Sequence, residues 1–380
     1  MATAALSASN SVIFALIGNL QDTYGFSDIG LGVIAATGFA ATFVVQILVA
    51  PLADRGHVKH LLLAGTLCSI AGNLLFAAGS NLFVFAGARA LVGAGAGCFL
   101  PAARAVMASI SPTGAAERLG KMGGAELGGF VLGPVIGGVL VAPLGIRWPF
   151  VVFCGAALLS FVLVSRQQLP ELPRSAASGR LAFDLLRHRR VLVAVLLCLS
   201  LYLPVGIYDA LWDRFLTDRG ASDVVVGLSL ACYGIPFIIF AAYGGRLADR
   251  HGPVRVAMRS LWIVAPLTAT YGLFPSPYVP IALGVVEAVV QAAASPAAQA
   301  AIAEAAPEGR ATAAQGLAGA TNVLSAAVMA LLASGAYGAF GPELVFIGGG
   351  VGVAVCGLCA WSLNRGTPPD RELATAPAAA

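Results

Sequence analysis

Long apolar runs are the feature of this sequence that most constrains its fold. They recur along all 380 residues, and each run of about twenty residues is long enough for a helix to cross a hydrocarbon core roughly 30 Å thick. Only 11% of the residues are charged, against about 25% in an average soluble domain. A soluble fold cannot cover that much apolar surface, so the sequence predicts an all-α, multi-pass membrane protein.

Charged clusters and Gly/Pro breaks divide the chain into twelve predicted membrane helices. They cover residues 3–24, 28–52, 59–78, 82–110, 119–142, 147–165, 191–216, 223–247, 254–273, 278–303, 312–337 and 343–364. We expect a first six-helix bundle over 1–165, a polar and basic linker over 166–190, a second bundle over 191–364 and a tail over 365–380.

The distribution of lysine and arginine predicts the orientation. With both termini in the cytoplasm, the outer helix ends hold only Arg147, Arg214 and Arg219, as the positive-inside rule requires. No basic segment and cleavage site precede the first apolar run, so we expect a retained helix. The net charge of +4 reflects these loops, and we expect a cell-membrane protein with no nucleic-acid partner.

The two halves of the chain resemble each other at an offset of 195 residues. The sequence Leu-Ala-Asp-Arg at 52–55 falls on the same sequence at 247–250, and Pro101 falls on Pro296. Parallel repeats of six helices predict two bundles with a site between them and alternating access by rocking. The partner of Val191 would precede Met1, so either the first helix is short or the given start lies inside it.

The duplicated segments resemble the signature loop of the major facilitator superfamily, G-x-L-A-D-R-x-G-R-K. The first copy reads APLADRGHVK over 50–59, and the second reads GRLADRHG over 245–252. The resemblance implies a twelve-helix fold of that superfamily and a conformational gate made by Asp54, Arg55, Asp249 and Arg250. Asp54 would dock on the N-terminus of helix eleven and Asp249 on that of helix five, where the helix dipole favours a carboxylate. Alternatively, these loops only retain positive charge inside.

The fifth predicted helix carries Gly129, Gly133, Pro134, Gly137 and Gly138. This pattern resembles the G-x-x-x-G-P-x-x-G-G motif of the superfamily's antiporters, and it would place these residues in conformational gating. Small residues let helices pack closely, and proline permits a bend. Ordinary small-residue packing is the alternative.

A further resemblance lies in the fourth helix, where Arg89, Gly93 and Gly95 match the R-x-x-x-G-x-G pattern of proton-coupled exporters. A charge within a membrane helix is costly without a partner. Together, the two motifs favour export over uptake.

Few ionisable residues lie within the predicted spans, and each suggests a functional role because of this cost. They are Asp22, Arg89, Glu126, Asp209, Asp213 and Glu287. By family resemblance, all but Glu126 fall on the helices that line the central cavity. A buried carboxyl group can bind and release a proton as access alternates.

Glu287 is our first choice as proton carrier because it lies deepest, and Asp209 follows. Asp213 has a solvated ion pair with Arg214 as its simpler explanation, and Asp22 would equally suit a helix end in water. Gln291 lies one turn beyond Glu287, and Trp212 adjoins Asp213, so both join the candidate cavity.

The predicted function is proton-coupled efflux of small amphipathic molecules, such as drugs or metabolites. The alternative is an importer or exporter of sugars, amino acids or organic anions with the same fold. No nucleophile–base pair, metal cluster or phosphate loop indicates an enzyme. We expect no cofactor besides the proton gradient, a small-molecule substrate and the lipid bilayer as partners, and a monomer.

Overall fold

The computed structural model describes residues 1–25, 28–111, 113–170, 182–221 and 223–365, in which every regular element is a helix. The first half contains α1 (Ala2–Tyr24), α2 (Asp28–Leu48), η1 (Ala50–Arg55), α3 (Val58–Ala78), α4 (Leu82–Ser109), α5 (Ala115–Leu144) and α6 (Trp148–Arg166). A short helix, η2 (Ala182–Arg187), precedes the second half.

The second half contains α7 (Arg189–Thr217), α8 (Asp223–His251), α9 (Pro253–Thr270), η3 (Tyr271–Leu273), α10 (Tyr278–Ala305) and α11 (Ala311–Asn364). The 54 residues of α11 would form a rod of about 80 Å at 1.5 Å per residue, far longer than a bilayer. Gly341 interrupts it with φ 80° and ψ 172°. The element is therefore two membrane helices, as the predicted spans 312–337 and 343–364 require.

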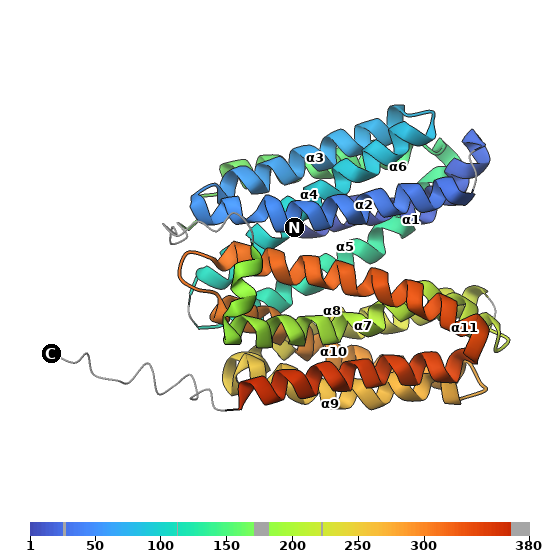
Figure 1. Cartoon of the computed structure of the whole chain (residues 1–380). Helices are drawn as coiled ribbons and strands as arrows, with labels where there is room; N and C mark the ends of the chain where they lie inside the picture. Colours follow the sequence, from blue (N-terminus) through green and yellow to red (C-terminus); the bar gives the residue numbers. More distant parts are fainter. Residues whose placement is uncertain (26–27, 112, 171–181, 222, 366–380) are drawn as a thin grey trace.

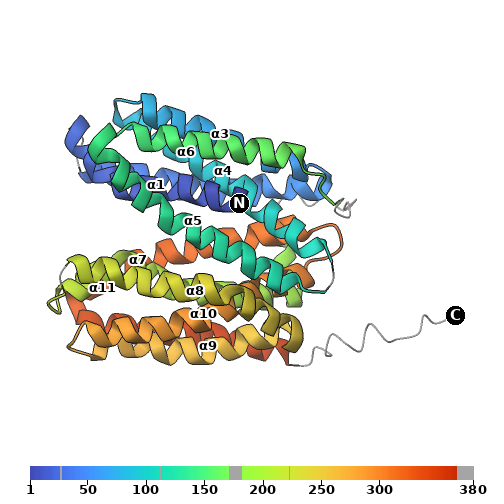
Figure 2. The same cartoon turned by 180° about the vertical axis from the view of Figure 1, so that it is seen from behind.

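The helices form two bundles side by side (Figure 1). α1 packs on α5, α2 on α4 and α3 on α6, while α7 packs on α11 and α8 on α10. α5 and α8 meet between the bundles (Figure 2), and α2 meets α11. Within the described residues, ten helical segments are long and apolar enough to cross a membrane, which confirms the predicted multi-pass fold.

The sequence repeat is also a repeat of backbone conformation. Glycines with positive φ occur in corresponding pairs, offset by 195 or 196 residues: Gly25 and Gly220, Gly56 and Gly252, Gly114 and Gly309, Gly145 and Gly341. Side chains disfavour this conformation, so each pair marks the same turn in both halves. The extent of the linker and tail stays a prediction, because 171–181 and 366–380 lie outside the described residues.

Three predicted boundaries were wrong by four residues; one is the start of the fifth helix, which lies at Ala115 rather than at 119. The second helix ends at Leu48 rather than at 52, because a separate 3-10 helix with Pro51 near its start carries Asp54 and Arg55. The eighth continues to His251, so the second copy of the signature sequence is the last turn of a helix rather than a loop.

Candidate functional site

Glu287 lies inside the second bundle and is fully buried, with 0% of its surface exposed. Its Oε2 accepts a hydrogen bond from the hydroxyl of Tyr208 on α7 at 2.8 Å and one from that of Tyr271 in η3 at 2.5 Å. The Tyr208 hydroxyl also lies 3.2 Å from that of Thr268 on α9. Oε1 is buried and has no hydrogen-bond partner among the described residues. The Glu287 carboxyl group is thus held by hydrogen bonds from neutral hydroxyl groups.

The two tyrosines that hold this carboxyl group belong to an aromatic cluster. Tyr208, Trp212 and Tyr271 have pairwise centroid distances of 5.7 Å and edge-to-face orientations, the arrangement that aromatic quadrupoles favour. The Trp212 indole donates to Ser229 of α8 at 2.9 Å. Gln291 is buried one turn along α10 from Glu287. The structure therefore brings Trp212, Gln291 and Glu287 to the same bundle interior.

Arg89 lies in the other bundle and is 2% exposed. Its Nη1 donates to the backbone oxygen of Asn10 on α1 at 2.8 Å and to the side-chain oxygen at 2.6 Å. Gly38 of α2 leaves room for the guanidinium, because a Cβ there would lie 2.5 Å from Arg89 Nε. Gly93 of α4 lets α2 and α4 pack closely at this point, because a Cβ on Gly93 would lie 2.2 Å from the Gly38 backbone oxygen.

The candidate residues do not form one cluster. Arg89 is bound within the first bundle and Glu287 within the second, and no hydrogen bond or ion pair between described residues joins them. Arg89 and Glu287 therefore make no direct contact that would join them in one coupling core, and their shared role stays a prediction. The side chains of Asp22, Asp209 and Asp213 lie outside the described residues.

Asp54 joins the two bundles at one end of the molecule. Its Oδ1 accepts from the backbone N–H of Thr312 and its Oδ2 from that of Ala313, both at 2.7 Å. These amides belong to the first turn of α11, where a helix has no internal acceptors for its N–H groups. The docking expected for Asp54 is present. Arg55 is exposed and makes no ion pair among the described residues.

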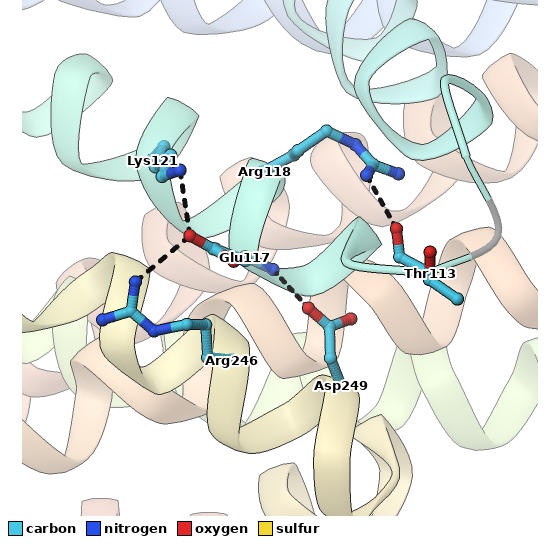
Figure 3. Close-up of polar contacts among 6 residues, drawn as sticks. All are labelled: Thr113, Glu117, Arg118, Lys121, Arg246 and Asp249. Carbon is cyan, nitrogen blue, oxygen red and sulfur yellow. Dashed lines mark hydrogen bonds and ion pairs between the residues drawn. The ribbon is translucent and has the colours of Figure 1, made fainter.

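Asp249 makes the corresponding contact on the other side of the interface (Figure 3). Its two oxygens accept from the N–H groups of Ala116 and Glu117 at the start of α5, both at 2.9 Å. The Glu117 carboxylate in turn lies 3.2 Å from Arg246 of α8 and 2.9 Å from Lys121. We refer to the end of the molecule that holds Asp54 and Asp249 as the aspartate end; it is the predicted cytoplasmic end.

Arg250, the neighbour of Asp249, is exposed and makes no ion pair with a described residue. Of the four residues predicted to form a gate, the two aspartates therefore make contacts between the bundles. The role of all four as a gate stays a prediction.

The glycines of the α5 motif pack against α1. A Cβ on Gly129 would lie 2.0 Å from the Ala4 oxygen, and one on Gly133 would lie 2.4 Å from the Ala8 oxygen. A Cβ on Gly137 would meet a side chain of α1 at 2.8 Å, whereas one on Gly138 would meet nothing within 4 Å. Three of the four glycines therefore permit close helix contact, and Pro134 lies within the uninterrupted helix α5.

Several functional partners escaped the sequence analysis. Arg104 of α4 donates through Nη2 to both carboxylate oxygens of Glu126, at 3.1 and 3.0 Å. Arg104 stands five residues before the end of α4, and its charge is the only feature of the sequence that could have indicated this pairing. Asn10 and Tyr271 carry no charge, and nothing in the sequence indicates which face of its helix each side chain occupies.

Two pseudo-symmetric six-helix bundles, joined by carboxylate contacts at one end, define the class: a multi-pass membrane protein with the architecture of a secondary transporter. The family model "Major Facilitator Superfamily" matches residues 1–208 and 207–379. The chain belongs to the major facilitator superfamily.

Relatives in sequence include multidrug resistance protein MdtG of Serratia proteamaculans, 28% identical over 255 residues, with 63% of this chain and 62% of the relative covered. Quinolone resistance protein NorA of Staphylococcus aureus is 28% identical over 228 residues, covering 57% of each chain. The matched segments thus span less than two thirds of these relatives' length.

Solved structures with the same fold include the human organic anion transporter MFSD10, with a TM-score of 0.76 and 18% identity, covering 94% of this chain and 97% of that one. The Escherichia coli fucose:proton symporter FucP has a TM-score of 0.76 and 16% identity, covering 95% and 97%. At these identities the likeness concerns the fold alone.

Proposed function

We propose that the protein is a proton-coupled exporter of small amphipathic molecules that works by alternating access. The observation that carries the proposal is Glu287: a fully buried carboxyl group within a membrane bundle, held by two tyrosine hydroxyls. An ionisable side chain is expensive in such a place. A role in carrying a proton explains why a carboxyl group stands there.

Alternating access is supported by where the bundles are joined. The interbundle hydrogen bonds described above, those of Asp54, Asp249 and Glu117, all lie at the aspartate end. These contacts must break if the bundles rock open at that end. They favour the closed state of the aspartate end, and a ligand that binds better to the other state shifts the equilibrium.

In this cycle, the Glu287 site faces the two sides of the membrane in turn. A proton is held at Oε1, the oxygen without a described partner, while the Tyr208 and Tyr271 hydroxyls keep Oε2 in place. When water reaches the site from the other side, the carboxyl group releases the proton. The aromatic rings provide an apolar wall against which an amphipathic substrate can lie.

Export of drug-like molecules is supported by the names of the sequence relatives, multidrug resistance protein MdtG and quinolone resistance protein NorA. The sugar symporter FucP shares the fold at 16% identity, which favours no particular substrate. Efflux through the cell membrane with both termini in the cytoplasm agrees with the basic loops. We further propose a monomer that is not an enzyme, needs no cofactor and binds no nucleic acid.

The test is dye accumulation in inverted membrane vesicles energised by a proton gradient. We expect the wild-type chain to accumulate a lipophilic fluorescent dye, a protonophore to abolish this, and Glu287→Gln to lose it. Glu308→Gln, which removes an exposed glutamate, is the matched control and should retain uptake. Gradient-driven uptake by Glu287→Gln at the wild-type rate would refute Glu287 as the proton carrier.

A further inference from the structure

The short helix η2 lies within the predicted linker and binds the aspartate end. Ala182 and Leu185 are both 0% exposed, and η2 packs on α7 and α11. Between these two buried residues, Asp184 accepts a double hydrogen bond from Arg310: Nη1 to Oδ2 at 2.9 Å and Nη2 to Oδ1 at 3.0 Å. This parallel, bidentate geometry is the most specific that an arginine and a carboxylate can make.

Arg310 stands at a place where a positive charge is unfavourable. It is the N-cap residue of α11, next to the partial positive charge at the N-terminus of the helix, and it is only 8% exposed. Two carboxylates offset this charge. Asp184 binds it directly, and Asp54, whose oxygens accept from the amides of Thr312 and Ala313 in the same turn, attracts it through space.

The other side of the interface lacks this arrangement. The docked amides of Ala116 and Thr312 are offset by 196 residues, and the N-cap two residues before each is Gly114 in α5 and Arg310 in α11. Asp249 therefore docks on a helix start without an N-cap arginine and without η2. A carboxylate from the linker takes part on the α11 side only, whereas on the α5 side Glu117 pairs with Arg246 and Lys121.

We propose that Asp184 is a positioning residue of the gate, which holds Arg310 so that the first turn of α11 receives Asp54. The linker thereby takes part in closing the aspartate end. This inference rests on the proposed function only because it describes the contact of Asp54 with α11 as part of a gate. Arg310 lowers the pKa of the Asp184 carboxyl group by hydrogen bonding to it, in agreement with a bound, ionised aspartate.

Hydrogen exchange at single-residue resolution tests this proposal. The N–H groups of Thr312 and Ala313 have no acceptor within α11, so their protection reports the docking of Asp54. The same holds for Ala116 and Glu117 with Asp249, which gives an internal reference within each sample. The measurement is made on the full chain in lipid nanodiscs, without substrate.

In Asp184→Asn we expect exchange at Thr312 and Ala313 to be about threefold faster or more, as for the loss of a partly exposed ion pair. Exchange at the start of α5 should stay within experimental error. Asp184→Glu, which keeps the charge, should restore most of the protection, and Glu308→Gln, which removes an exposed carboxylate two residues from Arg310, should change nothing.

Unchanged exchange at the start of α11 in Asp184→Asn would overturn the proposal, and so would equal acceleration at both helix starts, which indicates general destabilisation. If Asp184→Asn does not fold, Arg310→Gln provides the same comparison of the two helix starts. Because exchange is read without substrate, a chain that moves no dye would refute the proposed function while leaving this test intact.

Discussion

The contact between α1 and α5 gives a sharp prediction about stability. In Gly129→Ala, the new Cβ would lie 2.0 Å from the Ala4 oxygen and 2.7 Å from its carbonyl carbon. Both atoms belong to a helix backbone and cannot rotate away, so α1 and α5 must separate by roughly 1 Å or more. Overpacking of this kind costs about 1–3 kcal/mol.

The same motif supplies the control. Gly138→Ala adds the same methyl group to the same helix, but its Cβ meets nothing within 4 Å. Alanine favours a helix over glycine by about 1 kcal/mol, and this gain is common to both variants. The difference between Gly129→Ala and Gly138→Ala therefore isolates the steric cost, about 1–3 kcal/mol.

Thermal unfolding of the purified variants in one detergent, followed by tryptophan fluorescence or by loss of the monodisperse peak, measures this difference. We expect Gly129→Ala to unfold at a temperature several degrees lower than Gly138→Ala, and Gly138→Ala to match or exceed the wild type. Equal midpoints for the two variants would show that the glycines do not hold α1 and α5 together, and the close-packing interpretation of the motif would be wrong.

Three further outcomes are expected. Gly120→Ala would place a Cβ 2.2 Å from a backbone oxygen of α8 in the other bundle; it should block closure of the aspartate end and abolish dye uptake, whereas Gly123→Ala, with nothing within 4 Å, should retain it. Tyr271→Phe removes a donor to the Glu287 carboxyl group and should slow proton-driven dye uptake about tenfold at an unchanged protein level. Arg310 holds the pKa of the Asp184 carboxyl group below its ordinary value of 3.8. The ion pair therefore stabilises the folded protein fully above pH 3.8, and this stabilisation is lost as the pH falls through the lower pKa of the folded state. The difference in unfolding midpoint between wild type and Asp184→Asn should be constant from about pH 5 to 8 and vanish in stronger acid.

The sequence predicts the fold well because membrane helices are defined by length and apolarity, both of which are local. The twelve spans follow from the apolar runs, and Gly341 interrupts α11 between the last two predicted helices. The docking of Asp54 and Asp249 is implied by the resemblance of the two signature sequences to the superfamily's loop, and the dipole at a helix start favours a carboxylate there. In the second copy, α8 continues past Asp249 to His251, because this copy has no proline at the position of Pro51 in the first copy.

The partners of the buried charges could not be predicted, because they depend on how each helix is rotated about its axis. Asn10 binds Arg89 and Tyr271 binds Glu287. Asn10 and Tyr271 are uncharged, and each lies on a different helix from the charged residue that it binds. Arg104 is a further case: its position near the end of α4 suggests a solvated side chain, whereas packing against α5 buries it beside Glu126.

The arrangement of these partners constrains how coupling can work in the proposed cycle. Arg89 is bound to Asn10 within one bundle, and Glu287 to two tyrosines within the other. Rocking of the bundles as rigid bodies leaves both sets of contacts intact and breaks those that cross the interface, such as the contacts of Asp54, Asp249 and Glu117. Coupling by a direct exchange between Arg89 and Glu287 is therefore not what this geometry favours. Instead, protonation at Glu287 has to depend on which side admits water, and the interbundle contacts decide that side.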